Sequence, residues 1–362
     1  MSADLLQRTI PSVESIKSTL GMASALPKSY KVAIFKKMNE PLTLEEVELK
    51  EPGEGYILIK TIACGVCHSD LYVQDGGFGD LTPRIPGHEV IGKVAAVGPG
   101  EKTWKIGDLV GGAWHGGHDG TCKYCRRGLF QLCENEAING ISMDGGYAEY
   151  CHLRTEAVVR IPEDADPVSY APLLCAGVTL FNGIRNMHII SGETVAIQGL
   201  GGLGHLGLQY ASKLGFRTVA LSSSAVKEKF ARDLGAHDYI DGSKEDHGEA
   251  LQKMGGAALI VCTAPNPEII KPLMNGLQRG GKLLILAPVG DVSIPTASLI
   301  TQNLSVCGWA CGHNLDSEEA IKFAEVHGVK CMVEKFPLEK ANEALEHMKE
   351  GKARFRCVLV FE

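Results

Sequence analysis

The stretch "AIQGLGGLGHLG", residues 196–207, is the strongest indicator of fold in this 362-residue chain. Gly199, Gly201 and Gly204 follow a G-x-G-x-x-G pattern between an expected strand, "TVAIQ", and an expected helix from Gly204 to about Leu214. Glycines at this spacing let the backbone approach a pyrophosphate, which the unpaired N–H groups at the helix N-terminus bind. Because the pattern alone is common, its weight depends on the strand before it and the helix after it.

Apolar strands alternate with helical patterns from Thr194 onward. The expected strands are "TVAIQ", "RTVALS", "DYI", "ALIVCTA", "KLLILAP" and "LSVCGWA". This alternation is typical of βαβ units and predicts a doubly wound parallel sheet. The glycine-rich loop, which also contains Gly202 and Leu203, is therefore predicted to bind a dinucleotide.

Short β-like runs precede this region, among them "KVAIF", "GYILIKTIA", "GKVAAVG" and "AEYCHL". The closing stretch holds two helical patterns and a terminal strand. We expect an α/β protein with a dinucleotide-binding domain, residues 180–317, inserted into a β-rich domain. Residues 29–179 form that β-rich domain, residues 318–362 complete it, and residues 1–28 are an extension ahead of the fold.

Composition limits the possible partners. The chain is 44% hydrophobic and 22% charged, which is ordinary for a globular protein with a sizeable core. Its net charge of -7 argues against a nucleic-acid partner. No apolar run reaches the about 18–20 residues of a membrane span, and the N-terminus lacks a secretory signal. We expect a cytoplasmic protein, whose twelve cysteines are then suited to metal binding more than to disulfides.

The stretch "CGVCHSD", residues 64–70, combines thiols, an imidazole and a carboxylate. With His88 of "PGHEV" and Cys175 of "APLLCAG", Cys67 would complete a Cys2His set that leaves a fourth position open, as in catalytic zinc sites. Asp70 is placed to orient a liganding imidazole. Spacing alone does not bring these residues together, so a disulfide, a redox pair or a cysteine-rich turn stays open.

A second cluster, "HDGTCKYCRRGLFQLC", spans residues 118–133. Cys122, Cys125 and Cys133 have the tight spacing of a metal knuckle, and Asp119 stands three residues before the first of them. The pattern predicts a closed tetrahedral zinc site with three sulfur ligands and one oxygen ligand. The alternative is three reduced thiols in a loop.

The end of the second expected strand indicates the coenzyme. NAD sites usually place an Asp or Glu there, about 20 residues after the glycines, to bind the ribose 2′-OH. Here the residues are Ser222, Ser223 and Ser224, with Lys227 close by. Three hydroxyls and an ammonium suit a 2′-phosphate, so the sequence predicts NADP(H). The alternative is a polar turn ahead of an N-capped helix.

Over residues 30–362 the chain resembles the zinc-dependent medium-chain alcohol dehydrogenases. The matching pieces are "CGVCHSD", "PGHE", the cysteine cluster, "LLCAGVT", "GLGGLGH" and "RFRCVLV". The run "SSS" followed by Lys227 places it nearest the NADP(H)-dependent cinnamyl-alcohol-dehydrogenase-like branch, whereas yeast-type relatives carry an acidic residue where Ser222 stands. The resemblance implies a GroES-like catalytic domain, a Rossmann domain, two zinc ions per chain and a homodimer or homotetramer.

The resemblance also implies an activity and its site. The reaction is hydride transfer between NADPH and the carbonyl carbon of a small aldehyde, with zinc as the Lewis acid on its oxygen. Cys67, rather than Cys64, is the metal ligand of the first stretch. The other implied residues are His88 and Cys175 as zinc ligands, Glu89 as a carboxylate that can approach the zinc, Ser69 as the proton carrier, and His68 and Arg356 near the coenzyme pyrophosphate.

Two positions depart from the family pattern. Tyr72 stands where many relatives have the histidine that ends the proton relay, and a phenol with a pKa near about 10 is a poor proton acceptor. Asp119 stands where the second cluster normally has its first cysteine, so His115 or His118 is an alternative ligand there. Trp114 matches a pocket position of the family.

Two other functions compete with an NADP(H)-dependent reductase. An NAD-dependent ethanol-type dehydrogenase is disfavoured by the missing acidic residue at Ser222. A non-catalytic NADPH-binding protein is disfavoured because Cys67, His88, Cys175 and Ser69 are all present. A metal assay combined with a coenzyme comparison separates the three.

Overall fold

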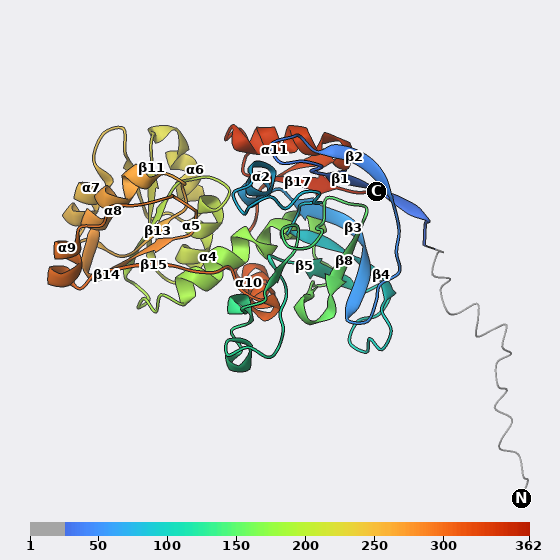
Figure 1. The fold of residues 1–362 in the computed structure, drawn as a ribbon. Coiled ribbons are helices and arrows are strands. Elements are labelled where there is room, and N and C mark those ends of the chain that lie inside the picture. Colours follow the sequence, from blue (N-terminus) through green and yellow to red (C-terminus); the bar gives the residue numbers. More distant parts are fainter. Residues whose placement is uncertain (1–25) are drawn as a thin grey trace, which may run out of the picture.

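The computed structural model describes residues 26–362, so the expected extension over residues 1–28 lies mostly outside the described residues. The described chain forms two lobes that lie side by side (Figure 1). One lobe surrounds a six-stranded sheet and the other a seven-stranded sheet, and two-stranded sheets complete the second lobe. The expected fold class, a β-rich domain joined to a doubly wound parallel sheet, is confirmed.

The six-stranded sheet is parallel throughout, with strand order β12-β11-β10-β13-β14-β15. Its strands are β10 (Thr194–Gln198), β11 (Arg217–Ser222), β12 (Asp238–Asp241), β13 (Ala257–Cys262), β14 (Leu277–Ile285) and β15 (Ser305–Gly308). All six expected strands are present. The order reverses direction at β10, the strand that leads into the glycine-rich loop, and such a switch point is where doubly wound sheets bind nucleotides.

Helices cover both faces of this sheet. The α-helices of the described residues are α2 (His68–Asp75), α3 (Pro167–Tyr170), α4 (Ala176–Arg185), α5 (Gly204–Lys213), α6 (Glu228–Asp233), α7 (His247–Lys253), α8 (Ile270–Asn275), α9 (Thr296–Gln302), α10 (Asn314–His327) and α11 (Ala341–Lys349). On β10, Val195 and Ile197 pack with α4 and α5, whereas Ala196 packs with α7 and α8. A strand buried on both faces reads as a continuous apolar run, which explains "TVAIQ".

The seven-stranded sheet joins the two ends of the chain. Its strands are β3 (Tyr56–Gly65), β4 (Val90–Val97), β5 (Leu109–Gly112), β8 (Tyr150–Arg154), β9 (Val159–Arg160), β16 (Val333–Pro337) and β17 (Arg356–Val360). Strand β17 pairs with β3, with Val358 opposite Gly65. Strand β16 was not among the expected strands. The proposed boundaries at residues 179 and 317 stay predictions.

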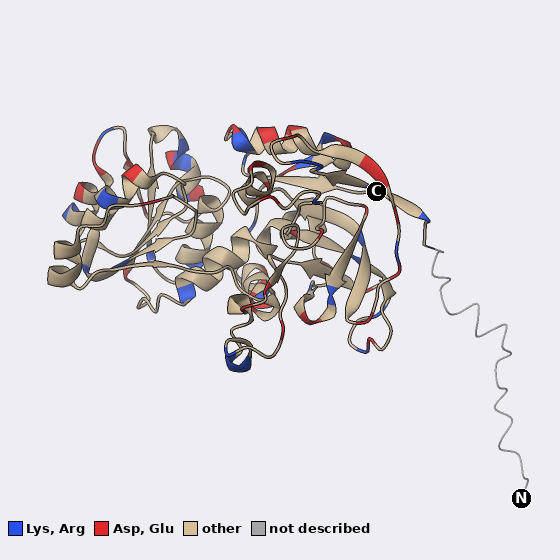
Figure 2. Cartoon of the chain, viewed as in Figure 1, with Lys and Arg blue, Asp and Glu red and all other residues tan. Residues whose placement is uncertain are grey.

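The remaining elements are short. They are β1 (Ser29–Ile34) paired with β2 (Thr43–Glu48), β6 (His115–Gly117) paired with β7 (Ala137–Ile138), and the 3-10 turns η1 (Cys125–Arg127), η2 (Phe130–Leu132), η3 (Thr155–Ala157), η4 (Ala171–Leu174), η5 (Ala225–Lys227), η6 (Pro267–Ile269) and η7 (Leu338–Lys340). Acidic and basic residues are interspersed along most of the chain, with basic residues gathered at η1 (Figure 2).

Within residues 26–362, no single helix is both long and apolar enough to cross a bilayer. One bent pair, Pro167–Leu174 with Ala176–Arg185, meets the length and composition test only when its two parts are taken together.

Candidate active site

Four predicted site residues, Cys67, His88, Glu89 and Cys175, form a largely buried cluster. One ligand atom from each lies within 4.8 Å of the others. The Sγ atoms of Cys67 and Cys175 are 3.9 Å apart. Two thiolates on one tetrahedral zinc, at a Zn–S distance of about 2.3 Å, lie about 3.8 Å from each other. The spacing of the two sulfurs is therefore that of a zinc site.

Strand pairing explains how ligands so far apart in sequence meet. Strands β3 and β4 are antiparallel, with Cys64 opposite Val90. The end of β3, which leads to Cys67, therefore lies beside the start of β4, which follows His88. Cys67 is the N-cap of α2, and Cys175 is the N-cap of α4.

The donor set fits the zinc ion that the sequence predicts. Within the described residues, neither ring nitrogen of His88 has a hydrogen-bond partner, and Oε2 of Glu89 has none. Buried polar atoms without partners cost free energy, so native proteins almost always satisfy them. A zinc ion held by two thiolates and one imidazole would satisfy one ring nitrogen of His88 and keep a fourth position open for a substrate.

The two thiols are electrostatically unequal. Hydrogen bonding from Cys175, followed by the charge on His88, holds the pKa of Cys67 well below its ordinary value. Hydrogen bonding with Cys311 and then with Cys67 raises the pKa of Cys175 well above its ordinary value. The surroundings therefore favour the thiolate form at Cys67, and a thiolate is the form that binds a metal.

Asp70 lies beside Cys67 and His88, two of the predicted metal ligands. Its Oδ2 accepts a hydrogen bond of 2.9 Å from the backbone N–H of Cys67, and its Oδ1 accepts one of 3.2 Å from that of Gly87. The same Oδ1 is 3.6 Å from Nδ1 of His88. The carboxylate is thus placed to orient the imidazole, as the sequence predicts.

A buried ion pair links the ligand cluster to the coenzyme loop. Arg356, at the start of β17, donates a hydrogen bond to Oε1 of Glu89. Burial raises the pKa of Glu89 to about 7 against the opposing charge of Arg356. A Cβ at Gly202 would lie 2.9 Å from Cδ of Arg356, so only glycine lets the arginine lie this close to the loop.

The glycines of this loop have separate structural roles. Gly199 has a φ of 90°, which favours glycine. A Cβ at Gly204 would lie 1.7 Å from the carbonyl oxygen of Gly199, so glycine is needed for α5 to begin this close to β10. A Cβ at Gly201 would meet no atom within 4 Å, which leaves room for a ligand. These are the features of a dinucleotide-binding turn.

The three serines follow β11 directly. Ser222 is buried at the end of the strand, and Ser223 is exposed. Ser224 is the N-cap of η5, yet within the described residues its side chain makes no capping hydrogen bond. Lys227 donates a hydrogen bond of 3.0 Å from Nζ to the carbonyl of Leu200, which places its ammonium against the glycine-rich loop. The absent cap weakens the interpretation of this segment as a simple helix start.

The second cluster assembles as the spacing predicts. Ligand atoms of Asp119, Cys122, Cys125 and Cys133 all lie within 4.8 Å of one another. Hydrogen bonds from the Cys122 backbone and from the Asn135 side chain hold the pKa of Asp119 well below its ordinary value. A carboxylate kept charged in this way suits a cation.

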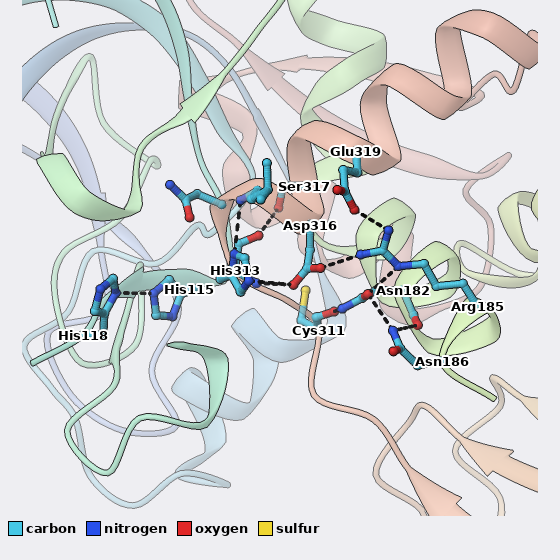
Figure 3. A network of polar contacts seen from close by, with 12 residues as sticks. His115, His118, Asn182, Arg185, Asn186, Cys311, His313, Asp316, Ser317 and Glu319 are labelled. Carbon is cyan, nitrogen blue, oxygen red and sulfur yellow. Dashed lines mark hydrogen bonds and ion pairs between the residues drawn. The ribbon is translucent and has the colours of Figure 1, made fainter. Parts of the chain in front are cut away.

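His115 and His118, the alternative ligands, face each other instead (Figure 3). Nε2 of His115 is 3.1 Å from Nδ1 of His118, and Nδ1 of His115 is 2.9 Å from Oε1 of Glu136. His118 also stacks on Phe130. These contacts occupy both nitrogens of His115, which leaves Asp119 as the fourth member of the cluster.

A polar network holds the segment that follows β15 against α4 (Figure 3). Asn182 donates a hydrogen bond of 3.2 Å to the carbonyl of Cys311, and Arg185 pairs with Asp316 at 2.6 Å. The Sγ of Cys311 is 3.8 Å from the carbonyl of Cys175. Nothing in the sequence indicates that Cys311 lies beside Cys175, because its stretch lacks the spacing of a metal-binding motif.

Ser69 and the aromatic residues border the ligand cluster. The Oγ of Ser69 is 3.8 Å from Sγ of Cys67. Trp114 packs edge-on against His88, a predicted metal ligand, with ring centres 5.1 Å apart. Phe78 bridges Trp114 and Tyr72, at ring distances of 6.2 and 5.7 Å, and Tyr72 contacts His68. These rings form one wall beside the ligand cluster.

Comparisons with known proteins identify the family of this chain. The family model for the alcohol dehydrogenase GroES-like domain matches residues 53–163, and the model for zinc-binding dehydrogenases matches residues 202–326. The alcohol dehydrogenase patD of Penicillium expansum is 59% identical over 338 residues, which is 93% of this chain and 99% of that protein. An alcohol dehydrogenase of Geobacillus stearothermophilus is 40% identical over 91% of this chain and 98% of its own.

Solved structures show the same fold. A cinnamyl alcohol dehydrogenase from Sorghum bicolor superimposes with a TM-score of 0.84 at 28% identity, over 92% of this chain and 98% of that one. The chain belongs to the zinc-type medium-chain alcohol dehydrogenases, as the resemblance in its sequence predicted. It is an oxidoreductase of that family.

Proposed function

We propose that this chain is a zinc-dependent, NADP(H)-dependent alcohol dehydrogenase that acts as an aldehyde reductase. The observation that carries the proposal is the buried cluster of Cys67, His88, Glu89 and Cys175, with Ser69 beside it. We further propose two zinc ions per chain, a homodimer or homotetramer, and a cytoplasmic location.

The bound groups would supply the chemistry: Zn²⁺ as a Lewis acid toward the substrate oxygen and NADPH as the hydride donor. Cys67, His88 and Cys175 would hold the metal, and Glu89 would approach it when water exchanges. The hydroxyl of Ser69 would donate the proton that the reduced oxygen needs. Burial of the ligands keeps water away, which strengthens these interactions.

The coenzyme would lie along the glycine-rich loop. Gly199, Gly201, Gly202, Leu203 and Gly204 would present backbone N–H groups to the pyrophosphate. His68 and Arg356 would add positive charge near it. Beyond the ribose, Ser222, Ser223, Ser224 and Lys227 would bind the 2′-phosphate of NADPH.

The aromatic residues around the predicted ligands support a proposal for the substrate class. Trp114, Phe78 and Tyr72 form a continuous row of rings that begins at the ligand His88. Flat aromatic faces favour planar, unsaturated or aromatic carbonyl compounds over charged ones. We therefore propose a primary alcohol or aldehyde of this kind, such as the substrate of a biosynthetic reductase.

Removal of one metal ligand tests the proposal. Cys175→Ala should lose one zinc per chain and nearly all NADPH-dependent aldehyde reduction. The matched control is Cys151→Ala, which removes a different buried thiol, on β8. This variant should keep its full zinc content and its rate of aldehyde reduction. Elemental analysis and initial rates on the same samples give the result. A Cys175→Ala chain that keeps its zinc and its rate would contradict the assignment.

A further inference from the structure

Tyr147 is a fully buried tyrosine close to the ligand cluster. It is 0% exposed and stands in the stretch "GGYAEY", which leads into β8. Its hydroxyl donates a hydrogen bond of 3.0 Å to Oδ2 of Asp70. A buried phenol has to find such a partner, but a core position would have been filled as well by phenylalanine.

The accepting carboxylate connects Tyr147 to two metal ligands. Oδ2 of Asp70 also accepts from the backbone N–H of Cys67, at 2.9 Å, and Oδ1 faces Nδ1 of His88 at 3.6 Å. Asp70 is 0% exposed, so its orientation depends on these few contacts. The Tyr147 hydroxyl is the one side-chain hydrogen-bond donor to this carboxylate among the described residues.

We propose that Tyr147 is a positioning residue for the catalytic metal, acting through Asp70, whose carboxylate it locks in the orientation that aims the His88 imidazole. The inference rests on the proposed function, since it assumes a metal at Cys67, His88 and Cys175. Contacts outside the ligand set commonly change metal affinity by about 10- to 100-fold when they are removed.

The hydroxyl and the ring of Tyr147 have separable roles. The ring fills a space that depends on glycine, because a Cβ at Gly87 would lie 2.5 Å from Cδ1 of Tyr147. Gly87 directly precedes His88, so the ring also supports the backbone from which the ligand projects. Phenylalanine retains this packing and removes only the hydrogen bond.

Two other roles could account for the buried pair of Tyr147 and Asp70, and the observations favour neither. Asp70 also caps α2 by accepting from the Cys67 backbone, a role that needs neither Tyr147 nor burial. Transfer of the phenol proton to Asp70 is also disfavoured, because burial, followed by the charge of Asp70, raises the pKa of Tyr147 well above its ordinary value. The phenol therefore remains the donor.

The experiment measures the rate at which zinc leaves the full-length, zinc-loaded chain in excess chelator. The variants are Tyr147→Phe, Asp70→Asn and the double variant Tyr147→Phe/Asp70→Asn. Tyr210→Phe is the matched control, because Tyr210 is equally buried and its hydroxyl donates to the carbonyl of Ala320, at 3.3 Å. Cys175→Ala identifies which release phase belongs to the catalytic site.

Tyr147→Phe should release the catalytic zinc about tenfold faster or more, whereas Tyr210→Phe should stay within about twofold of wild type. In the Asp70→Asn background, Tyr147→Phe should add little, because both changes break one chain of contacts. Replacing zinc by Co²⁺ should show shifted visible absorption bands in Tyr147→Phe and wild-type bands in Tyr210→Phe.

Three results would overturn the inference. The first is a rate of zinc release by Tyr147→Phe equal to that of wild type, even if the melting temperature of the variant falls. That result would mean that Tyr147 stabilises the fold by packing alone. The second is a full tenfold effect in the Asp70→Asn background, which would show that Tyr147 does not act through Asp70. The third is a wild-type chain without Cys175-dependent zinc, which overturns the proposed function as well and is thereby distinguishable.

Discussion

His205, near the start of α5, lies between the glycine-rich loop and the segment before β16, and its Nδ1 donates a hydrogen bond of 3.2 Å to the carbonyl of Gly201. On the other side of the ring, the backbone N–H of Met332 donates to Nε2 at 3.4 Å. The ring also stacks on Phe355, with centres 4.8 Å apart. A neutral imidazole is needed for this arrangement, because one nitrogen donates and the other accepts.

The titration of His205 predicts a loss of stability in acid. Burial, opposed by hydrogen bonding to Gly201 and aided by the charge of Arg356, lowers the pKa of His205 from 6.5 to about 4. The unfolded chain therefore takes up a proton near pH 6.5 that the folded chain refuses until about pH 4. The contribution of neutral His205 to the free energy of unfolding is fully present above pH 6.5 and is lost as the pH falls. The loss reaches about 2 kcal/mol at pH 5.

His205→Gln should remove this loss, because glutamine can donate and accept without titrating. Urea unfolding of wild type and variant at pH 7.5 and pH 5 gives the comparison. The free energy of unfolding should fall by about 2 kcal/mol less in the variant between these two pH values. An identical fall in both chains would show that His205 is not the titrating group.

The cation beside the glycine-rich loop should select the coenzyme. Lys227→Ala should weaken NADPH binding about tenfold and change NADH binding little, because one charge-assisted contact to the 2′-phosphate is lost. Lys229→Ala is the matched control, since Lys229 instead pairs with Asp233 at 2.7 Å. Titration of protein fluorescence measures both affinities. Equal losses of affinity for NADPH and NADH would show that Lys227 does not contact the 2′-phosphate.

Ser222, at the end of β11, should also affect the preference for NADPH over NADH. Ser222→Asp would place a carboxylate against the 2′-phosphate and beside the ribose hydroxyls. Repulsion of the phosphate should then shift preference toward NADH. The ratio of kcat/KM for the two coenzymes measures the shift, and an unchanged ratio would rule out contact at this position.

The second cluster should contribute to folding more than to chemistry. Cys125→Ala should lose one zinc per chain and lower the melting temperature by about 5 °C or more, because structural zinc contributes folding free energy. Activity per folded molecule should remain close to wild type. Cys307→Ala removes a half-buried thiol on β15 as a control. A full zinc content in Cys125→Ala would show that the second cluster holds no zinc.

Ser69 and Tyr72 should differ sharply in the proton relay. Ser69→Ala should lower kcat about 100-fold or more and leave coenzyme affinity nearly unchanged, since the hydroxyl serves the reduced oxygen alone. Tyr72→Phe should cost little, because a phenol is a poor base near pH 7. Tyr72→His should help alcohol oxidation more than aldehyde reduction.

Profiles of rate against pH in both directions check the relay. A collapse of aldehyde reduction in Tyr72→Phe, with coenzyme binding intact, would make the phenol a true relay member. The row of rings from His68 through Tyr72 to Phe78 allows a second role for Tyr72, in packing. Tyr72→Phe preserves that packing, so a loss of rate would report the hydroxyl.

The parallel sheet was predictable because its central strands are apolar on both faces. "TVAIQ" and "RTVALS" match β10 and β11 to the residue. Strand β16 was not predictable in this way, since its five residues, Val333–Pro337, contain two adjacent charged residues and a terminal proline and show no apolar alternation. Its assignment depends on pairing with β17, which lies near the end of the chain.

The two predicted metal sites differ in the same way: the ligands of one lie close together in the sequence, and those of the other lie far apart. Cys122, Cys125 and Cys133 lie within one short stretch, so spacing alone predicts their meeting. Cys67 and Cys175 are 108 residues apart, and only the resemblance to a family placed them together before the structure did. Tyr147 carried no sequence signal, because nothing in "GGYAEY" indicates that its phenol reaches Asp70.

The reduction of aldehydes with NADPH at a zinc site is the activity on which the other proposals depend. It is tested by comparing initial rates of aldehyde reduction with NADPH and with NADH, at equal and subsaturating concentrations, on zinc-loaded wild-type protein. We predict a rate at least about tenfold higher with NADPH, from the charge-assisted contacts of Lys227 and the absence of a carboxylate at Ser222. Equal rates, or a faster reaction with NADH, would contradict the proposed function.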